Sequence, residues 1–240
     1  MPGFSDGMVN VEKDEQRHIA FGVKLLADLN REDPEVRPAI REILGEVMPH
    51  TVGVFRPPND DERYIEVFGE TMVGVATTGQ RQLDTRLQAA GIERYGPEGV
   101  LPFFDEQITH EERAARAFVM QRAGLFSGGA EPVRSDPQAL EYYFDIIAAS
   151  VSPAHKLKKR TTLQWEFSDG PTWHITIDGP SARSDSGSVP KPDVIFRTDL
   201  STWVGVTSGS IAPGKAVVTR KLRIKGNPLT LAKLTGVFER

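Results

Sequence analysis

Glu15 and His18 are the residues of this sequence whose types and spacing most readily suggest chemistry. They stand three positions apart within EKDEQRHIAFG (residues 12–22), so on a helix they share one face. That face continues with the apolar or small residues Val11, Gly22, Leu25 and Leu29. Burying two ionisable groups in such a stripe costs several kcal/mol unless they have a partner. A metal ion is one candidate partner, because carboxylate and imidazole are common metal ligands.

The elements that would position this pair are helices, since the first half of the sequence repeats its apolar residues about every fourth position. The pattern predicts helices over residues 6–29, 36–47, 61–90 and 109–125. Gly91 is suited to end the third of these helices. Thr109 and Glu112 have the spacing of a capping box at the start of the fourth.

The second half begins with a helix and then changes its period. Asp136 and Pro137 are typical of a helix start, with Leu140, Tyr143, Phe144 and Ile147 on its core side. Beyond Thr161 the apolar residues alternate, in TTLQWEF, TWHITID, DVIFRT and RKLRIK. Alternation predicts a mainly antiparallel sheet with one dry face, and the turn SDGPT (168–172) predicts a hairpin between the first two strands. Asn227 and Pro228 predict a last helix over NPLTLAKLTGVF.

Composition and charge indicate two modules. From Asp136 onward there are 14 Lys and Arg against 10 Asp and Glu, whereas the remainder has 15 against 23, giving +4 and −8 within a net charge of −4. The segment SGGAEPVRSDP resembles a linker, so we expect a helical module at 1–126, a linker at 127–135 and a second module at 136–240.

Several classes of protein are excluded or disfavoured by the same composition. The chain has no cysteine, which excludes disulfides and thiolate metal sites. It shows no secretory signal, no apolar run of membrane-spanning length and no nucleic-acid motif, so a cytoplasmic location is expected. The basic segment KLKKR (156–160) allows a weak contact with an anionic membrane surface.

The second module resembles the sterol carrier protein 2 family between Lys191 and Leu234. The residues that follow the family pattern there are Pro192, Asp193, Val194, Trp203, Ser208, Gly209, Pro213, Lys215, Ala216, Leu222, Ile224, Lys225 and Gly226. This resemblance implies an α+β domain with a five-stranded sheet, and an apolar tunnel that holds a fatty acyl chain, a sterol or another lipid.

The tunnel is expected to be lined by five residues taken from the sheet and the helices around it: Phe196, Trp203, Leu222, Leu229 and Leu234. The alternative is a solid core, because a dry sheet face and apolar helices can also pack directly on each other. A tunnel would bind long chains usefully, since each buried CH₂ contributes about 0.8 kcal/mol.

The first module resembles the C-terminal part of ferritin-like di-iron proteins near the small subunit of ribonucleotide reductase, through KDEQRHIAFGVKLL. The resemblance implies that Glu15 and His18 ligate iron or manganese and that Asp14 supports them by hydrogen bonding. Such sites take a Glu-x-x-His from each of two helices and a lone Glu from each of two more, and this chain has a single Glu-x-x-His, so only a half-site is expected.

Two functions follow from these resemblances. The first is a lipid or sterol carrier fused to a partial ferritin-like module that serves as a scaffold or forms a homodimer. The alternative is a di-iron or manganese–iron oxidoreductase that acts on a lipid presented by the carrier, with the remaining metal ligands in an upstream segment of a longer protein.

Overall fold

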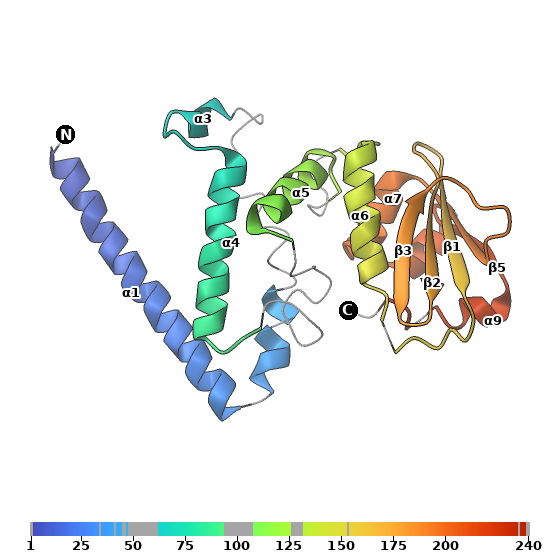
Figure 1. Ribbon diagram of the computed structural model, residues 1–240, viewed down its shortest axis with the longest axis horizontal. Helices are drawn as coiled ribbons and strands as arrows, with labels where there is room; N and C mark the ends of the chain where they lie inside the picture. The colour runs from blue at the N-terminus through green and yellow to red at the C-terminus, as the bar shows by residue number, and fades with distance from the viewer. Residues whose placement is uncertain are drawn as a thin grey trace.

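The computed structural model of the chain describes residues 2–33, 35–40, 42–44, 47, 62–93, 108–125, 132–152, 154–234 and 236–238. The helices are α1 (Pro2–Glu32), α3 (Arg63–Glu66), α4 (Met72–Ala89), α5 (His110–Arg122), α6 (Pro137–Ala149), α7 (Leu200–Thr207), α8 (Pro213–Val218) and α9 (Pro228–Leu231). Figure 1 shows α1 and α4 at one end of the molecule and the sheet at the other. None of the described helices combines the length and the hydropathy that crossing a bilayer requires.

The predicted fold class is confirmed, because helices precede a five-stranded sheet with the strand order β3-β2-β1-β4-β5. The strands are β1 (Thr161–Phe167), β2 (Trp173–Asp178), β3 (Ser181–Ser186), β4 (Val194–Thr198) and β5 (Arg223–Gly226). The predicted hairpin is also confirmed, since β1 and β2 pair antiparallel from Thr161↔Ile177 to Trp165↔Trp173. One pair, β1 with β4, is parallel, so the sheet is mixed.

The predicted helix over 61–90 is two helices, and the prediction of a single one is wrong. Gly69 has a φ of +73°, a left-handed conformation that ends α3 and that an α-helix cannot continue through. Thr71 then starts α4, where its Oγ1 accepts a hydrogen bond from the amide of Gly74. The predicted end at Gly91 is confirmed, with a φ of +68° and the amide of Ile92 bonded to the carbonyl of Leu87.

Most of the buried apolar side chains belong to one of two cores. The larger one lies between one face of the sheet and the helices α5, α6, α7 and α8. The smaller one consists of Ile40, Leu87, Ala90 and Ile92, with Val23 and Leu26 of α1 packed against it. Met120 and Ala123, at the end of α5, belong to the larger core, which therefore extends before the expected linker. Of that linker, residues 127–131 lie outside the described residues.

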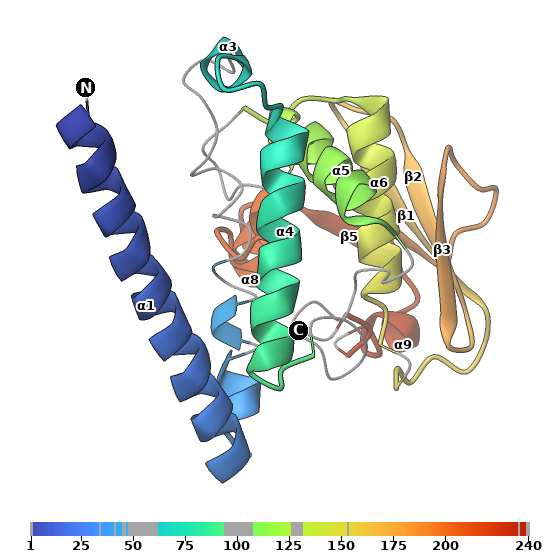
Figure 2. The same ribbon diagram turned by 60° about the vertical axis from the view of Figure 1, so that its left-hand side comes forward.

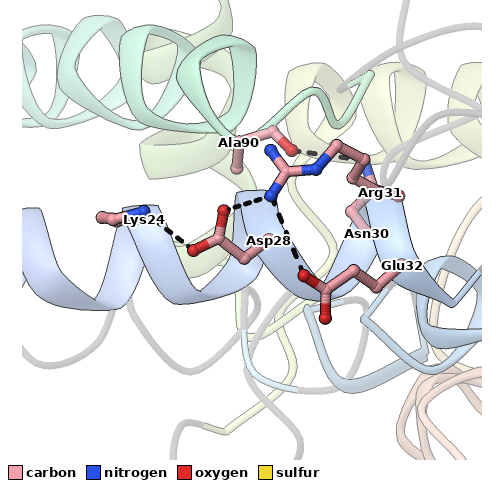
Figure 3. A network of polar contacts seen from close by, with 6 residues as sticks. All are labelled: Lys24, Asp28, Asn30, Arg31, Glu32 and Ala90. Atoms are coloured by element: carbon pink, nitrogen blue, oxygen red, sulfur yellow. Dashed lines mark hydrogen bonds and ion pairs between the residues drawn. The ribbon is translucent and has the colours of Figure 1, made fainter.

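The end of α1 is tied to the end of α4 by polar contacts (Figure 3). The side-chain amide of Asn30 donates to the carbonyl oxygens of Ala90 at 3.2 Å and Gly91 at 2.9 Å, which have no partner within α4. Asp28 accepts from Lys24 at 2.9 Å and from Arg31 at 2.7 Å, and these two hydrogen bonds lower the pKa of its carboxyl group. These contacts hold the C-terminal end of α1 against the end of α4.

Candidate functional site

The inner face of the sheet carries a row of aromatic residues because the strand register aligns them. Trp165 lies opposite Trp173 of β2 and opposite Phe196 of β4. Directly paired residues point to the same side of a sheet, so all three side chains face the helices. Leu163, Ile175 and Val194 continue this face, and each is fully buried.

Two capped helices complete the enclosure. Asp136 accepts a hydrogen bond from the amide of Ala139 at 2.8 Å and starts α6, which places Phe144 against the sheet. Asp199 does the same for Thr202 at 2.7 Å and starts α7, which carries Trp203. The carboxylate of Asp169, from the turn after β1, accepts from the amide of Leu200 and fixes α7 to the sheet.

The aromatic side chains touch one another across this interior. The ring of Phe144 stacks on Trp173 at 5.0 Å and meets Trp165 edge-on at 5.3 Å. Trp165 in turn stacks on Phe196 at 5.0 Å and meets Trp203 edge-on at 5.4 Å. The result is a continuous aromatic cluster between α6, the sheet and α7.

All three tryptophans of the sequence belong to this cluster, and their indole nitrogens are unusual. The Nε1 atoms of Trp165, Trp173 and Trp203 are buried, and none has a hydrogen-bond acceptor among the described residues. Indole nitrogen is a donor only, and a buried donor without an acceptor is destabilising. The interior is thus lined by apolar side chains. It also holds three indole N–H donors, which could donate to an oxygen atom of a ligand.

One polar pair bridges the two helices that enclose the interior. The hydroxyl of Tyr143 on α6 lies 2.5 Å from the hydroxyl of Thr207 on α7. Burial raises the pKa of the Tyr143 phenol well above its ordinary value, and the hydrogen bond to Thr207 opposes this only in part. Tyr143 is therefore neutral and acts as a structural link between α6 and α7.

The five residues expected to line a tunnel are divided by the structure. Phe196, Trp203 and Leu222 are buried in the larger core, and Leu234 is half-buried against it. Leu229 is 75% exposed, so it does not line the buried interior with the others. The short α9, only four residues long, turns Leu229 outward while Leu231 packs inward.

The opposite face of the sheet carries a polar network that the sequence did not reveal. Gln164 is buried there, because the connection from β3 to β4 crosses over it and the amide of Val189 donates to its Oε1 at 2.8 Å. Its Nε2 donates to Glu166 at 2.9 Å, and Arg197 donates to the other carboxylate oxygen of Glu166 at 2.6 Å. A polar residue at an alternating position gave no sequence signal that a loop would cover it.

Glu15 and His18 are not where the metal hypothesis needs them. Their side chains are 65% and 77% exposed, and their nearest charged atoms are 4.0 Å apart. The carboxylate of Asp14 forms an ion pair with Arg17 at 2.9 Å, and not with His18. No group of three or more potential metal ligands occurs among the described residues. The expected burial of Glu15 and His18 is wrong, because no described residue covers their face of α1.

The family comparison matches the part of the chain that contains the sheet and the helices α7, α8 and α9. Residues 148–239 match the model of the SCP-2 sterol transfer family. No curated protein matches the chain.

Solved structures similar to the chain include sterol carrier proteins and a sulfatase. Sterol Carrier Protein 2 Like 2 from Aedes aegypti is 21% identical, covering 37% of this chain and 82% of that chain with a TM-score of 0.30. Sterol Carrier Protein 2 from Yarrowia lipolytica is 16% identical, covering 49% and 92% with a TM-score of 0.28.

The stereoselective inverting sec-alkylsulfatase Pisa1 from Pseudomonas sp. is 16% identical, covering 77% of this chain and 32% of that chain with a TM-score of 0.38. The chain thus spans about a third of the length of the alkylsulfatase it matches. The residues 148–239 that match the family model include all five strands of the sheet.

Proposed function

We propose that the C-terminal domain binds a lipid, such as a fatty acid or a sterol, within its aromatic interior. The observation that carries this proposal is the set of three buried indole N–H groups that have no acceptor among the described residues. A lipid with an apolar body and one or two oxygen atoms complements such an interior, because its body packs on the rings and its oxygen accepts from an indole. The match of residues 148–239 to the model of the SCP-2 sterol transfer family supports the same class of ligand.

Binding requires the side chains of the interior to move apart, because the aromatic rings are in contact in this structure. Trp203 is suited to move, since it lies on an eight-residue helix and, among the described aromatic residues, its ring contacts only those of Phe196 and Trp165. We therefore expect a ligand to enter between α7 and the β4 side of the sheet, where Phe196, Trp203 and Leu222 meet.

Tryptophan fluorescence tests this proposal directly, because the three tryptophans of the chain all lie in the interior. A fatty acid brominated along its chain should quench the fluorescence on binding, and the unbrominated acid should compete. Trp203→Ala should weaken the binding, whereas Glu141→Ala on the exposed side of α6 should not. If neither brominated fatty acids nor brominated sterols quench, the proposed function is refuted.

We further propose that this domain exchanges its lipid at an anionic membrane surface. Between Asp199 and Glu239 the sequence contains six Lys and Arg residues and no Asp or Glu. The six are exposed, and they lie on α8, on β5 and in the segments that follow α8 and α9: Lys215, Arg220, Lys221, Arg223, Lys225 and Lys233. Each basic residue close to an anionic leaflet contributes about 1 kcal/mol to binding.

Exposed apolar side chains lie within the same basic segment. Val218 is 83% exposed and Leu229 is 75% exposed, while Val217 and Ile224 are also exposed. Ile224 pairs with Phe196 across β5 and β4, so it connects this surface to the edge of the aromatic interior. Basic groups that attract headgroups and apolar groups that enter the interfacial layer together favour peripheral binding.

Vesicle sedimentation tests the membrane proposal and compares the two basic segments of the domain. Phosphatidylcholine vesicles that contain phosphatidylserine should bind the protein, and pure phosphatidylcholine vesicles should not. Lys221→Glu/Lys225→Glu should abolish this binding, whereas Lys156→Glu/Lys158→Glu, an equal change of charge in KLKKR, should reduce it little. Equal binding to both kinds of vesicle would contradict the proposal.

A further inference from the structure

An apolar stripe along α1 has no partner within the described part of the chain. The helix has 31 residues and is thus about 46 Å long. Figures 1 and 2 both show its N-terminal half extending away from the other helices. The large apolar residues of the stripe are each more than a third exposed, namely Met8, Val11, Leu25 and Leu29.

The stripe is distinct from the face of α1 that packs on α4. Val23 and Leu26 are half-buried against the smaller core, and Asn30 is bonded to the end of α4. The stripe lies on the next face around the helix, where Met8, Val11, Glu15, His18, Gly22, Leu25 and Leu29 recur at alternating intervals of three and four residues. This is the spacing of a coiled-coil seam.

We propose that this stripe is covered by α1 of a second copy of the chain, in an antiparallel pair. A two-fold axis passing between residues 16 and 17 sets position 15 of one copy against position 18 of the other. The same axis sets position 11 against 22 and position 8 against 25. In a two-fold interface every such contact occurs twice, once on each side of the axis.

The chemistry of the stripe fits this register at each layer. Glu15 of one copy meets His18 of the second copy, so the two polar groups pair with each other. Met8 meets Leu25, which are both apolar and exposed in the single chain. Val11 meets Gly22, and a Cβ added at Gly22 would have no atom within 4 Å, so the single chain leaves space for a branched side chain there.

The same residues disfavour a parallel pair. A parallel arrangement in register would place Glu15 against Glu15 of the second copy and Gly22 against Gly22. The first contact sets like charges together, and the second leaves a gap in the seam. A polar residue in an otherwise apolar seam specifies direction and register in this way. The pair that resembled a metal half-site is therefore assigned to pairing between two copies.

Sedimentation of the full chain tests whether the seam forms. The wild-type protein should be a dimer, and His18→Glu should raise the dimer Kd by about tenfold or more, because it sets two carboxylates together in each central layer. The reversed double variant Glu15→His/His18→Glu restores the pairing and should recover the dimer. Lys13→Glu changes the charge on the opposite side of α1 and serves as the control.

Cysteine cross-linking tests direction and register, and the absence of native cysteine makes it specific. Met8→Cys/Leu25→Cys should form a covalent dimer on oxidation or with a short bismaleimide. Met8→Cys alone should not, because the two Met8 positions are about 25 Å apart in the antiparallel pair. A covalent dimer from Met8→Cys alone would establish a parallel pair and overturn the proposal.

The remaining outcomes are equally decisive. A protein that stays monomeric at every concentration overturns the proposal, and so does a dimer that His18→Glu leaves unchanged. Circular dichroism of each variant shows whether α1 is still helical, so a loss of dimer with retained helicity can be assigned to the seam itself.

Discussion

At the scale of single residues, Arg220 is the one non-glycine residue with a positive φ in the described part of the chain. Its φ is +60°, and it forms the turn by which α8 leads into β5. A side chain at such a φ costs roughly 1–2 kcal/mol, and glycine would avoid this cost. Arg220 also belongs to the basic segment between Asp199 and Glu239, which contains no acidic residue. The positive charge of its side chain therefore offers a reason why arginine stands where the backbone favours glycine.

Replacing Arg220 should therefore separate stability from membrane binding. Arg220→Gly removes the strain, although glycine gives the unfolded chain more freedom, and we expect a gain in unfolding free energy of up to about 1 kcal/mol. The same variant should bind phosphatidylserine vesicles less strongly. Urea unfolding and vesicle sedimentation measure the two effects. Arg220→Ala keeps the strain and loses the charge, so increased stability of that variant would contradict the explanation.

Prediction from sequence succeeds at those residues whose environment is created by nearby positions. The caps Thr109, Asp136 and Asn227 each accept the expected backbone hydrogen bond, because a cap depends only on the next three residues. Leu229 and Glu15 could not be placed in the same way. Their exposure depends on where a whole helix ends or which element lies beside it, and the local pattern does not contain that information.

At the scale of elements, the parallel pairing of β1 with β4 creates the polar network of the outer sheet face. Glu166 lies opposite Arg197, which donates to it at 2.6 Å. This hydrogen bond, with a smaller contribution from Gln164, holds the pKa of the Glu166 carboxyl below its ordinary value, against the opposing effect of partial burial. The network thus links two strands that are far apart in the sequence.

The network predicts a specific dependence of stability on pH. A carboxyl group with a lowered pKa in the folded state stabilises the fold above its unfolded pKa of about 4.3, and this contribution disappears as the pH falls through the folded pKa. Glu166→Gln should therefore be less stable than wild type at pH 7, by less than about 1 kcal/mol because the pair is partly exposed. The difference should vanish in acid. Urea unfolding from pH 7 to pH 3 measures it, and a difference that persists at pH 3 would assign the effect to packing.

Elements were predictable where one periodicity ran for their whole length. β1 and β2 follow strict apolar alternation and were bounded correctly, whereas β3, with the sequence SARSDS, contains a single apolar residue. Such an edge strand is stabilised by its hydrogen bonds to β2 and not by apolar burial, so alternation could not reveal it. The prediction of one helix over 61–90 failed for the opposite reason. The apolar pattern continues past Gly69, whereas the helical backbone is interrupted there.

At the scale of the whole molecule, the two cores should respond differently to ligand. The larger core holds all three tryptophans, and the smaller core joins α1, residue 40 and the end of α4. A ligand that binds only the folded C-terminal domain stabilises that domain, by about 2.7 kcal/mol at a concentration of 100 times Kd. It gives no such stabilisation to the smaller core, which contains none of the aromatic cluster.

Thermal unfolding followed by two signals tests this separation. Tryptophan fluorescence reports the larger core, while far-ultraviolet circular dichroism also reports α1 and α4, which together contain 49 helical residues. Saturating fatty acid should move the fluorescence transition to higher temperature. The circular dichroism signal should then show an earlier transition whose midpoint does not move, because α1 and α4 unfold without the ligand domain. A single transition that coincides in both signals and moves as a whole would mean that the two cores unfold as one cooperative unit, since coincidence of probes is the criterion for two-state behaviour.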